Sequence, residues 1–120
     1  MNNENLKLRT KQFALRVITL VESLPPDSTS SILGRQLLRS GTSVGANYRS
    51  ACRSKSAADF ISKMGTVEEE SDESGYWMEL LVDAGKVKAG KTSALMQEAN
   101  ELTAIAVSSI NTAKKSQVPK

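Results

Sequence analysis

Four arginines carry the clearest chemical signal in the sequence. At about 100° per residue of a helix, all four lie within roughly 40° of one line, and they are Arg35, Arg39, Arg49 and Arg53. A guanidinium group presents a planar fork of donors that fits carboxylates and phosphates alike. No aromatic residue interleaves this line, so the pattern does not indicate base stacking. Any nucleic-acid contact would therefore be to the phosphate backbone and independent of base sequence.

The same arginine stripe allows other interpretations. A row of charges is most often a solvated helix face, and residues 56–85 set eight acidic side chains against Lys63 alone, a net charge of −7. The acids from Glu68 to Glu73 could pair with the arginines, within one chain or inside an oligomer. Carboxylates therefore compete with phosphates as the expected partners of the stripe.

The acidic run also raises the question of a metal site. Helical bundles build di-iron sites from glutamates and Glu-x-x-His motifs, but the sequence contains no histidine. This excludes that ligand set, the usual zinc sites, and Ser-His-Asp or Cys-His catalysis. A cation site made of carboxylates alone stays open. We expect no enzyme activity, no metal site and no cofactor.

One segment matches a phosphate-binding loop. Residues 85–92, GKVKAGKT, satisfy the motif G-x-x-x-x-G-K-[ST] and precede a predicted helix. A working loop of this kind follows a buried parallel strand, whereas the residues before this one have the pattern of a long amphipathic helix. We interpret the match as a coincidence, and nucleotide binding is the least favoured function.

Four predicted helices position these residues. Apolar side chains recur at three- and four-residue steps, and the helices span about residues 5–24, 28–55, 57–84 and 93–115. A Pro-Pro pair ends the first helix, and short loops join the helices. This pattern predicts a single all-α domain over residues 1–120, an antiparallel up-down-up-down four-helix bundle.

Polar residues mark where three of these helices begin. Residues 27–30 offer several N-caps for the second helix. Ser56 stands three residues before Asp59, a variant of the capping box for the third. Thr92 or Ser93 is expected to cap the fourth.

The third helix carries more apolar surface than one bundle needs. Tyr76, Trp77 and Leu80 project from its sides and back, one turn from Glu73. An exposed cluster of this kind usually contacts a partner, so we expect these four residues to form an oligomer interface. The alternative is that helix ends or the loop of residues 86–91 cover the rings.

Three glycines share another face of the second helix. They are Gly34, Gly41 and Gly45, and each costs about 1 kcal/mol relative to alanine in a helix. We expect another helix to approach closely here, within the bundle or between subunits.

The overall composition favours one cytoplasmic domain. The net charge is +3, from 16 basic and 13 acidic residues, which by itself does not indicate nucleic-acid binding. The first residues lack the apolar core of a signal peptide, and no stretch is long and apolar enough to cross a membrane. Cys52 is the only cysteine and is expected to be a small buried apolar residue.

Several segments together resemble a known family. Residues 36–47, QLLRSGTSVGAN, followed by residues 58–64, ADFISKM, and by Glu73, are similar to the four helix bundle family named for proteins encoded in 23S rRNA intervening sequences. Ala46 and Asn47 are the most distinctive mark, and the resemblance covers about residues 5–115. Many members carry Glu-Gly where this chain has Ser50 and Ala51, so the role of that acid does not transfer.

The resemblance implies a bundle without enzyme activity. A related accessory protein of diversity-generating retroelements forms a basic pentameric ring that works with a reverse transcriptase and nucleic acid. We therefore expect a cytoplasmic homo-oligomer, a pentamer, that binds RNA or DNA. The main alternative is a structural or protein-interaction module whose arginines pair with its own acidic helix.

Overall fold

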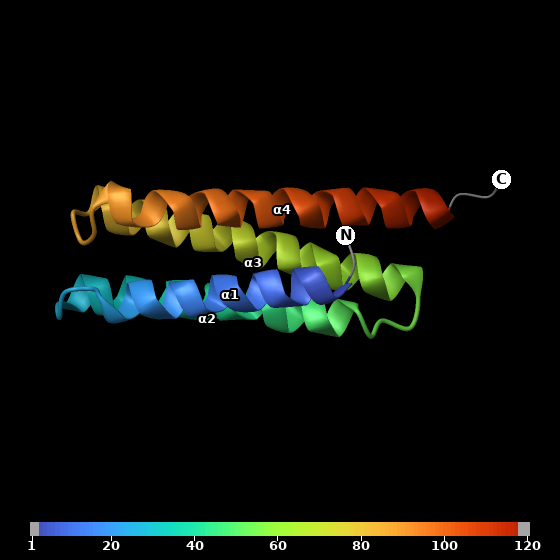
Figure 1. The fold of residues 1–120 in the computed structure, drawn as a ribbon, viewed down its shortest axis with the longest axis horizontal. Coiled ribbons are helices and arrows are strands. Elements are labelled where there is room, and N and C mark those ends of the chain that lie inside the picture. Colours follow the sequence, from blue (N-terminus) through green and yellow to red (C-terminus); the bar gives the residue numbers. More distant parts are fainter. Residues whose placement is uncertain (1–2, 118–120) are drawn as a thin grey trace.

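The computed structural model describes residues 3–117, which form four α-helices joined by short loops. They are α1 (Asn3–Glu22), α2 (Ser28–Ala51), α3 (Ala57–Asp83) and α4 (Ala89–Gln117). Successive helices run in opposite directions along a molecule that measures 55 × 22 × 20 Å (Figure 1). The predicted all-α up-down-up-down bundle is confirmed.

The helices contact one another unequally. Helix α3 packs along both α2 and α4, and α1 packs along α2, whereas α1 and α4 touch at only a few points. Among the described residues α1 and α3 do not meet, so they occupy diagonal corners of the bundle. The apolar part of the core consists of aliphatic side chains, two methionines, one phenylalanine and one tyrosine, and a few serines and threonines are buried beside it. Its most deeply buried apolar members are Phe13, Val17, Leu37, Val44, Met64, Met78, Leu81 and Ala106.

The glycines of α2 let α1 approach closely. A Cβ on Gly41 would lie 2.8 Å from both Val17 methyl groups, and one on Gly45 would lie 3.1 Å from the Thr10 hydroxyl oxygen. A Cβ on Gly34 would lie 3.0 Å from a Leu24 methyl. The close approach expected from the sequence is therefore made inside one chain.

Two helix ends fall earlier than the sequence predicts. Helix α1 ends at Glu22 rather than 24, because Leu24 precedes Pro25 and a residue in that position disfavours helical geometry. Helix α2 ends at Ala51 rather than 55. The following residues form the turn to α3, where Ser56 has the extended backbone of an N-cap.

The predicted caps of α2 and α3 are present. The Asp27 carboxylate accepts the backbone N–H of Ser30 at 2.8 Å, and the Ser56 hydroxyl accepts that of Asp59 at 3.0 Å. Each cap satisfies a backbone donor that the helix leaves unpaired.

The start of α4 was predicted wrongly. Helix α3 ends in a Schellman motif, in which Gly85 has φ +74° and the Lys86 N–H donates to the Leu81 carbonyl at 2.9 Å. This tight ending lets α4 begin at Ala89 instead of 93. Thr92 is fully buried, and its hydroxyl donates to the Ala89 carbonyl instead of capping the helix.

The sequence predicts no membrane-spanning helix. Across residues 3–117, the helices are too polar or too short in their apolar stretches to cross a bilayer.

Candidate nucleic-acid interface

The four arginines of the stripe lie in different surroundings. Arg35, Arg39 and Arg49 belong to α2, and Arg53 follows directly after its last turn. All four are exposed, but their neighbours differ because the stripe spreads over the surface between α1 and α3.

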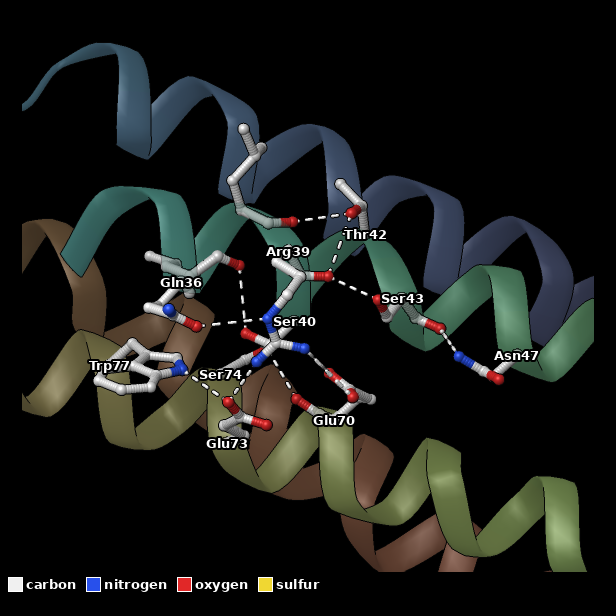
Figure 2. Close-up of polar contacts among 12 residues, drawn as sticks. Gln36, Arg39, Ser40, Thr42, Ser43, Asn47, Glu70, Glu73, Ser74 and Trp77 are labelled. Carbon is white, nitrogen blue, oxygen red and sulfur yellow. Dashed lines mark hydrogen bonds and ion pairs between the residues drawn. The ribbon is translucent and has the colours of Figure 1, made fainter. Parts of the chain in front are cut away.

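Arg39 pairs with the acidic helix (Figure 2). Its guanidinium contacts the Glu73 carboxylate through Nη2, and its Nη1 lies 3.3 Å from Glu70 Oε2. Its Nε donates to the side-chain oxygen of Gln36 at 3.3 Å, and Glu73 also accepts the indole N–H of Trp77 at 3.1 Å. Arg39 therefore joins α2 to α3, as the alternative interpretation of the stripe expects.

A buried hydroxyl pair fixes the register beneath Arg39. The hydroxyls of Ser40 and Ser74 lie 2.9 Å apart, and both side chains are fully buried. Because this contact sets α2 against α3, the residue before Ser40 comes level with Glu73 and can reach it. The pairing of Arg39 follows from the packing below it.

Arg35 makes only local contacts. Its guanidinium donates to the hydroxyl of Ser31 at 3.2 Å and to the carbonyl of the same residue at 3.4 Å. In the described part of the chain it forms no ion pair, so its charge faces solvent.

Arg49 and Arg53 meet a third cation at the other end of α2. Together with Lys63 of α3 they line an open surface depression of about 400 Å³, whose remaining walls are Ala46 and Ser50. Neither arginine has an ion-pair partner within residues 3–117. No acidic side chain lines the depression, so it concentrates positive charge.

Lys63 is held in place by Asp59. The ammonium nitrogen lies 3.0 Å from the Asp59 carboxylate one helical turn before it. This hydrogen bond, together with one from the backbone N–H of Lys55, lowers the pKa of Asp59 below its ordinary value. The carboxylate stays charged near neutral pH and orients the lysine.

The positive surface extends onto α1. A second groove of about 560 Å³ runs between α1 and α2, and Arg49 lines it together with Lys7, Lys11 and one acid, Glu4, which lies 3.4 Å from the Lys7 ammonium. Sequence reasoning missed both of these lysines and Lys63. Lys63 could have been suspected from its four-residue spacing to Asp59, but nothing in the sequence places the α1 lysines beside α2.

The residues of the family motif do not form one site. Ala46 is exposed and lines both grooves, while the side chain of Asn47 is half-buried and donates to the Ser43 carbonyl at 2.8 Å. Glu73 lies about two helical turns away in the Arg39 cluster. The motif residues therefore lie at two separate places, one on the surface of α2 and the other at the border between α2 and α3.

The proposed interface residues on α3 are only partly exposed. Trp77 packs against the core, Leu80 and Glu73 are half-buried, and Tyr76 is 53% exposed. The two rings make an edge-to-face contact with centroids 5.2 Å apart. Tyr76 is therefore the member of this set that offers apolar surface to a partner.

The acidic run and the match to a phosphate-binding loop are not arranged to bind a metal ion or a nucleotide. Within residues 3–117 the acidic side chains form no cluster placed to hold a metal ion, and two acids of the run are used by Arg39. The last four residues of the phosphate-loop match, 89–92, form the first turn of α4. The match therefore has no open loop between a strand and a helix.

Comparison with known proteins agrees with the fold and the motif. A crystal structure from Bacteroides thetaiotaomicron VPI-5482, of a protein of unknown function from the S23 ribosomal protein family, superposes with a TM-score of 0.85. It is 32% identical, over 92% of this chain and 99% of its own. No curated protein matches the chain. The family model for the 23S rRNA-intervening sequence protein matches residues 4–108, and the chain belongs to that family.

Proposed function

We propose that the protein is a non-enzymatic, cytoplasmic homo-oligomer that binds the phosphate backbone of RNA or DNA without sequence specificity. The observation that carries this proposal is the depression where Arg49, Arg53 and Lys63 converge and which no acidic side chain lines, although Lys63 is paired with Asp59 beside it. Such a protein would serve as an accessory factor to a nucleic-acid enzyme, for example a reverse transcriptase.

The chemistry of the depression suits phosphate better than bases. Guanidinium forks bind phosphate oxygens in pairs, while no aromatic side chain lines the depression to stack on a base. One such cluster binds weakly. A symmetric ring, for which we propose five subunits, would repeat the cluster in every subunit and gain affinity through multivalency.

Fluorescence anisotropy with labelled RNA and DNA of two unrelated sequences tests this function. We expect similar affinities for both sequences, falling steeply from about 50 to 200 mM salt because condensed counterions are released. The double variant Arg49→Gln/Arg53→Gln should bind about tenfold more weakly or worse. Its salt slope should be smaller by about one for each phosphate contact removed.

A matched control separates the effect of this site on binding from the effect of net charge. The variant Lys114→Gln/Lys115→Gln removes the same charge from two exposed lysines in the last turn of α4, and it should bind as the wild type does. Equal binding by wild type and the arginine variant would refute the proposal, as would strong preference for one sequence.

A protein-interaction module is the second candidate, because Arg39 is committed to Glu70 and Glu73. In this case the stripe would serve packing, and neither RNA nor DNA would bind at low salt. Light scattering would still report an oligomer, so the two measurements together distinguish the candidates.

A further inference from the structure

We infer that the outer face of α3 docks onto the outer face of α1 of a second copy of this chain. This inference rests on the proposed homo-oligomer and names the two surfaces that build it. Three observations support it. Helix α1 has an uncovered apolar strip, the outer face of α3 has an exposed tyrosine among acidic side chains, and the two helices carry opposite net charge.

The strip on α1 consists of two exposed leucines. Leu8 and Leu15 are 56% and 53% exposed, and because they are seven residues apart they lie on one face, about 10 Å from each other. Lys11 lies between them on the same face and is exposed. Within residues 3–117 nothing covers this strip, and Lys11 forms no ion pair.

The outer face of α3 has the complementary character. Tyr76 is 53% exposed, and Asp72 lies one turn before it on the same line. Glu69 and Glu79 extend that line in both directions, and all three acids are exposed. None of the three forms an ion pair among the described residues, so their charges are free for a partner.

The net charges of these elements favour this contact over pairing of like surfaces. Helix α1 carries four basic and two acidic residues and has a net charge of +2, and α2 adds three arginines and no acid. Helix α3 carries one lysine against eight acids, a net charge of −7. Two α3 faces would repel each other, whereas α3 against the basic side of α1 gains from complementarity.

The geometry makes this contact head-to-tail. Helices α1 and α3 stand at diagonal corners of the bundle (Figure 1), so their outer faces point away from each other. Each copy would therefore use two different surfaces, which produces a ring if the rotation closes and a filament if it does not. The depression formed by Arg49, Arg53 and Lys63 contains no residue of either face, although Arg49 also lines the groove that Leu8 and Lys11 border.

Two complementary variants test the contact by multi-angle light scattering at tens of micromolar. Lys11→Glu/Leu15→Glu blocks the α1 face, and Asp72→Lys/Tyr76→Lys blocks the α3 face. Each variant alone should have the monomer mass of 13.0 kDa. Their equimolar mixture should reach at least twice that mass, because one intact face of each kind remains and the two blocked faces carry opposite introduced charges.

The control and the contrary outcomes separate this inference from the proposed function. Lys114→Glu/Lys115→Glu should keep the wild-type mass. A wild type that assembles while both face variants keep its mass would refute this contact and leave the oligomer standing. A mixture that stays monomeric would also refute it. A monomeric wild type would refute both proposals.

Circular dichroism melting checks that the variants fold. If either double variant unfolds, the single variants Leu15→Ser and Tyr76→Ser replace it. Both substitutions are at exposed positions. The expected result is the same, namely a monomer for each variant alone and association in their mixture.

Discussion

At the scale of single residues, Arg39 shows how one side chain can hold two helices. It is 49% exposed, while the Glu70 and Glu73 side chains that it contacts are 16% and 33% exposed. Exposed ion pairs contribute little, typically below 1 kcal/mol each. Here one guanidinium serves two carboxylates and Gln36, and its loss leaves the two carboxylates to repel each other.

We therefore predict that Arg39→Gln lowers the free energy of unfolding by about 1 kcal/mol. Urea denaturation followed by circular dichroism measures it. The matched control is Arg35→Gln on the same helix, which loses only bonds to Ser31 and should change stability by less than about 0.5 kcal/mol. Equal effects of the two variants would show that Arg39 does not stabilise the packing of α2 against α3.

Two glycines should respond oppositely to the same substitution. A Cβ at Gly41 would lie 2.8 Å from the Val17 methyls, whereas one at Gly65 would have no heavy atom within 4 Å. We predict that Gly41→Ala destabilises the protein by about 1–2 kcal/mol, because overpacking outweighs the gain in helix propensity. Gly65→Ala should stabilise it by up to about 1 kcal/mol.

Thermal and urea denaturation of both glycine variants measure these differences. A stabilised Gly41→Ala would mean that α1 can move away from α2 at little cost. A destabilised Gly65→Ala would indicate that something outside the single chain approaches α3 at this position.

At the scale of elements, the sequence predicted the helices well and their neighbours poorly. The 3.6-residue pattern and the caps at Asp27 and Ser56 follow from local rules that the fold obeys. The start of α4 was missed because threonine is a common capping residue, whereas the Thr92 side chain points into the core. Burial against another helix overrides a local capping preference.

The arginine stripe was predicted as one surface for a related reason. Arg39 and Arg49 differ by about 80° around the helix, a spread small enough to count as one line. In a bundle this spread spans the gap between two neighbours, so Arg39 reaches α3 while Arg49 lines the groove toward α1. A helical projection gives the direction of a side chain, but only the packing gives its partner.

The helix caps predict the response to acid. Hydrogen bonds from the Ser30 backbone lower the pKa of Asp27, and those from Lys63 and the Lys55 backbone lower that of Asp59, both from an ordinary value of 3.8. Since the folded pKa values lie below the unfolded ones, this stabilisation is complete above about pH 5. It is lost as the pH falls through the folded values.

We predict that Asp27→Asn and Asp59→Asn flatten the loss of stability between about pH 5 and pH 2. Urea midpoints across this range measure it. Glu68→Gln is the control, because the Glu68 side chain has no hydrogen bond or ion pair in the described part of the chain, and its profile should follow the wild type. Profiles for the cap variants that coincide with the wild type would contradict the assigned role of the carboxylates.

At the scale of the whole molecule, the bundle has one weak seam. Helices α1 and α4 touch sparsely, and open depressions of about 580 and 490 Å³ lie along their border. Between these depressions Arg9 bridges to α4, with 2.7 Å to Glu98 and 3.1 Å to Glu101. Within residues 3–117 these are the only ion pairs between the two helices.

This arrangement makes α1 the helix that opens first. Its other side is held by close packing on the α2 glycines, so loss of the Arg9 bridge should loosen α1 without unfolding the remaining helices. We predict that Arg9→Gln raises amide hydrogen exchange several-fold in α1 and much less in α3. Arg16→Gln, an exposed arginine on the same helix without an ion pair among the described residues, should leave exchange unchanged. A uniform increase over all four helices would show instead that the bundle opens as one cooperative unit and that the α1–α4 seam has no separate weakness.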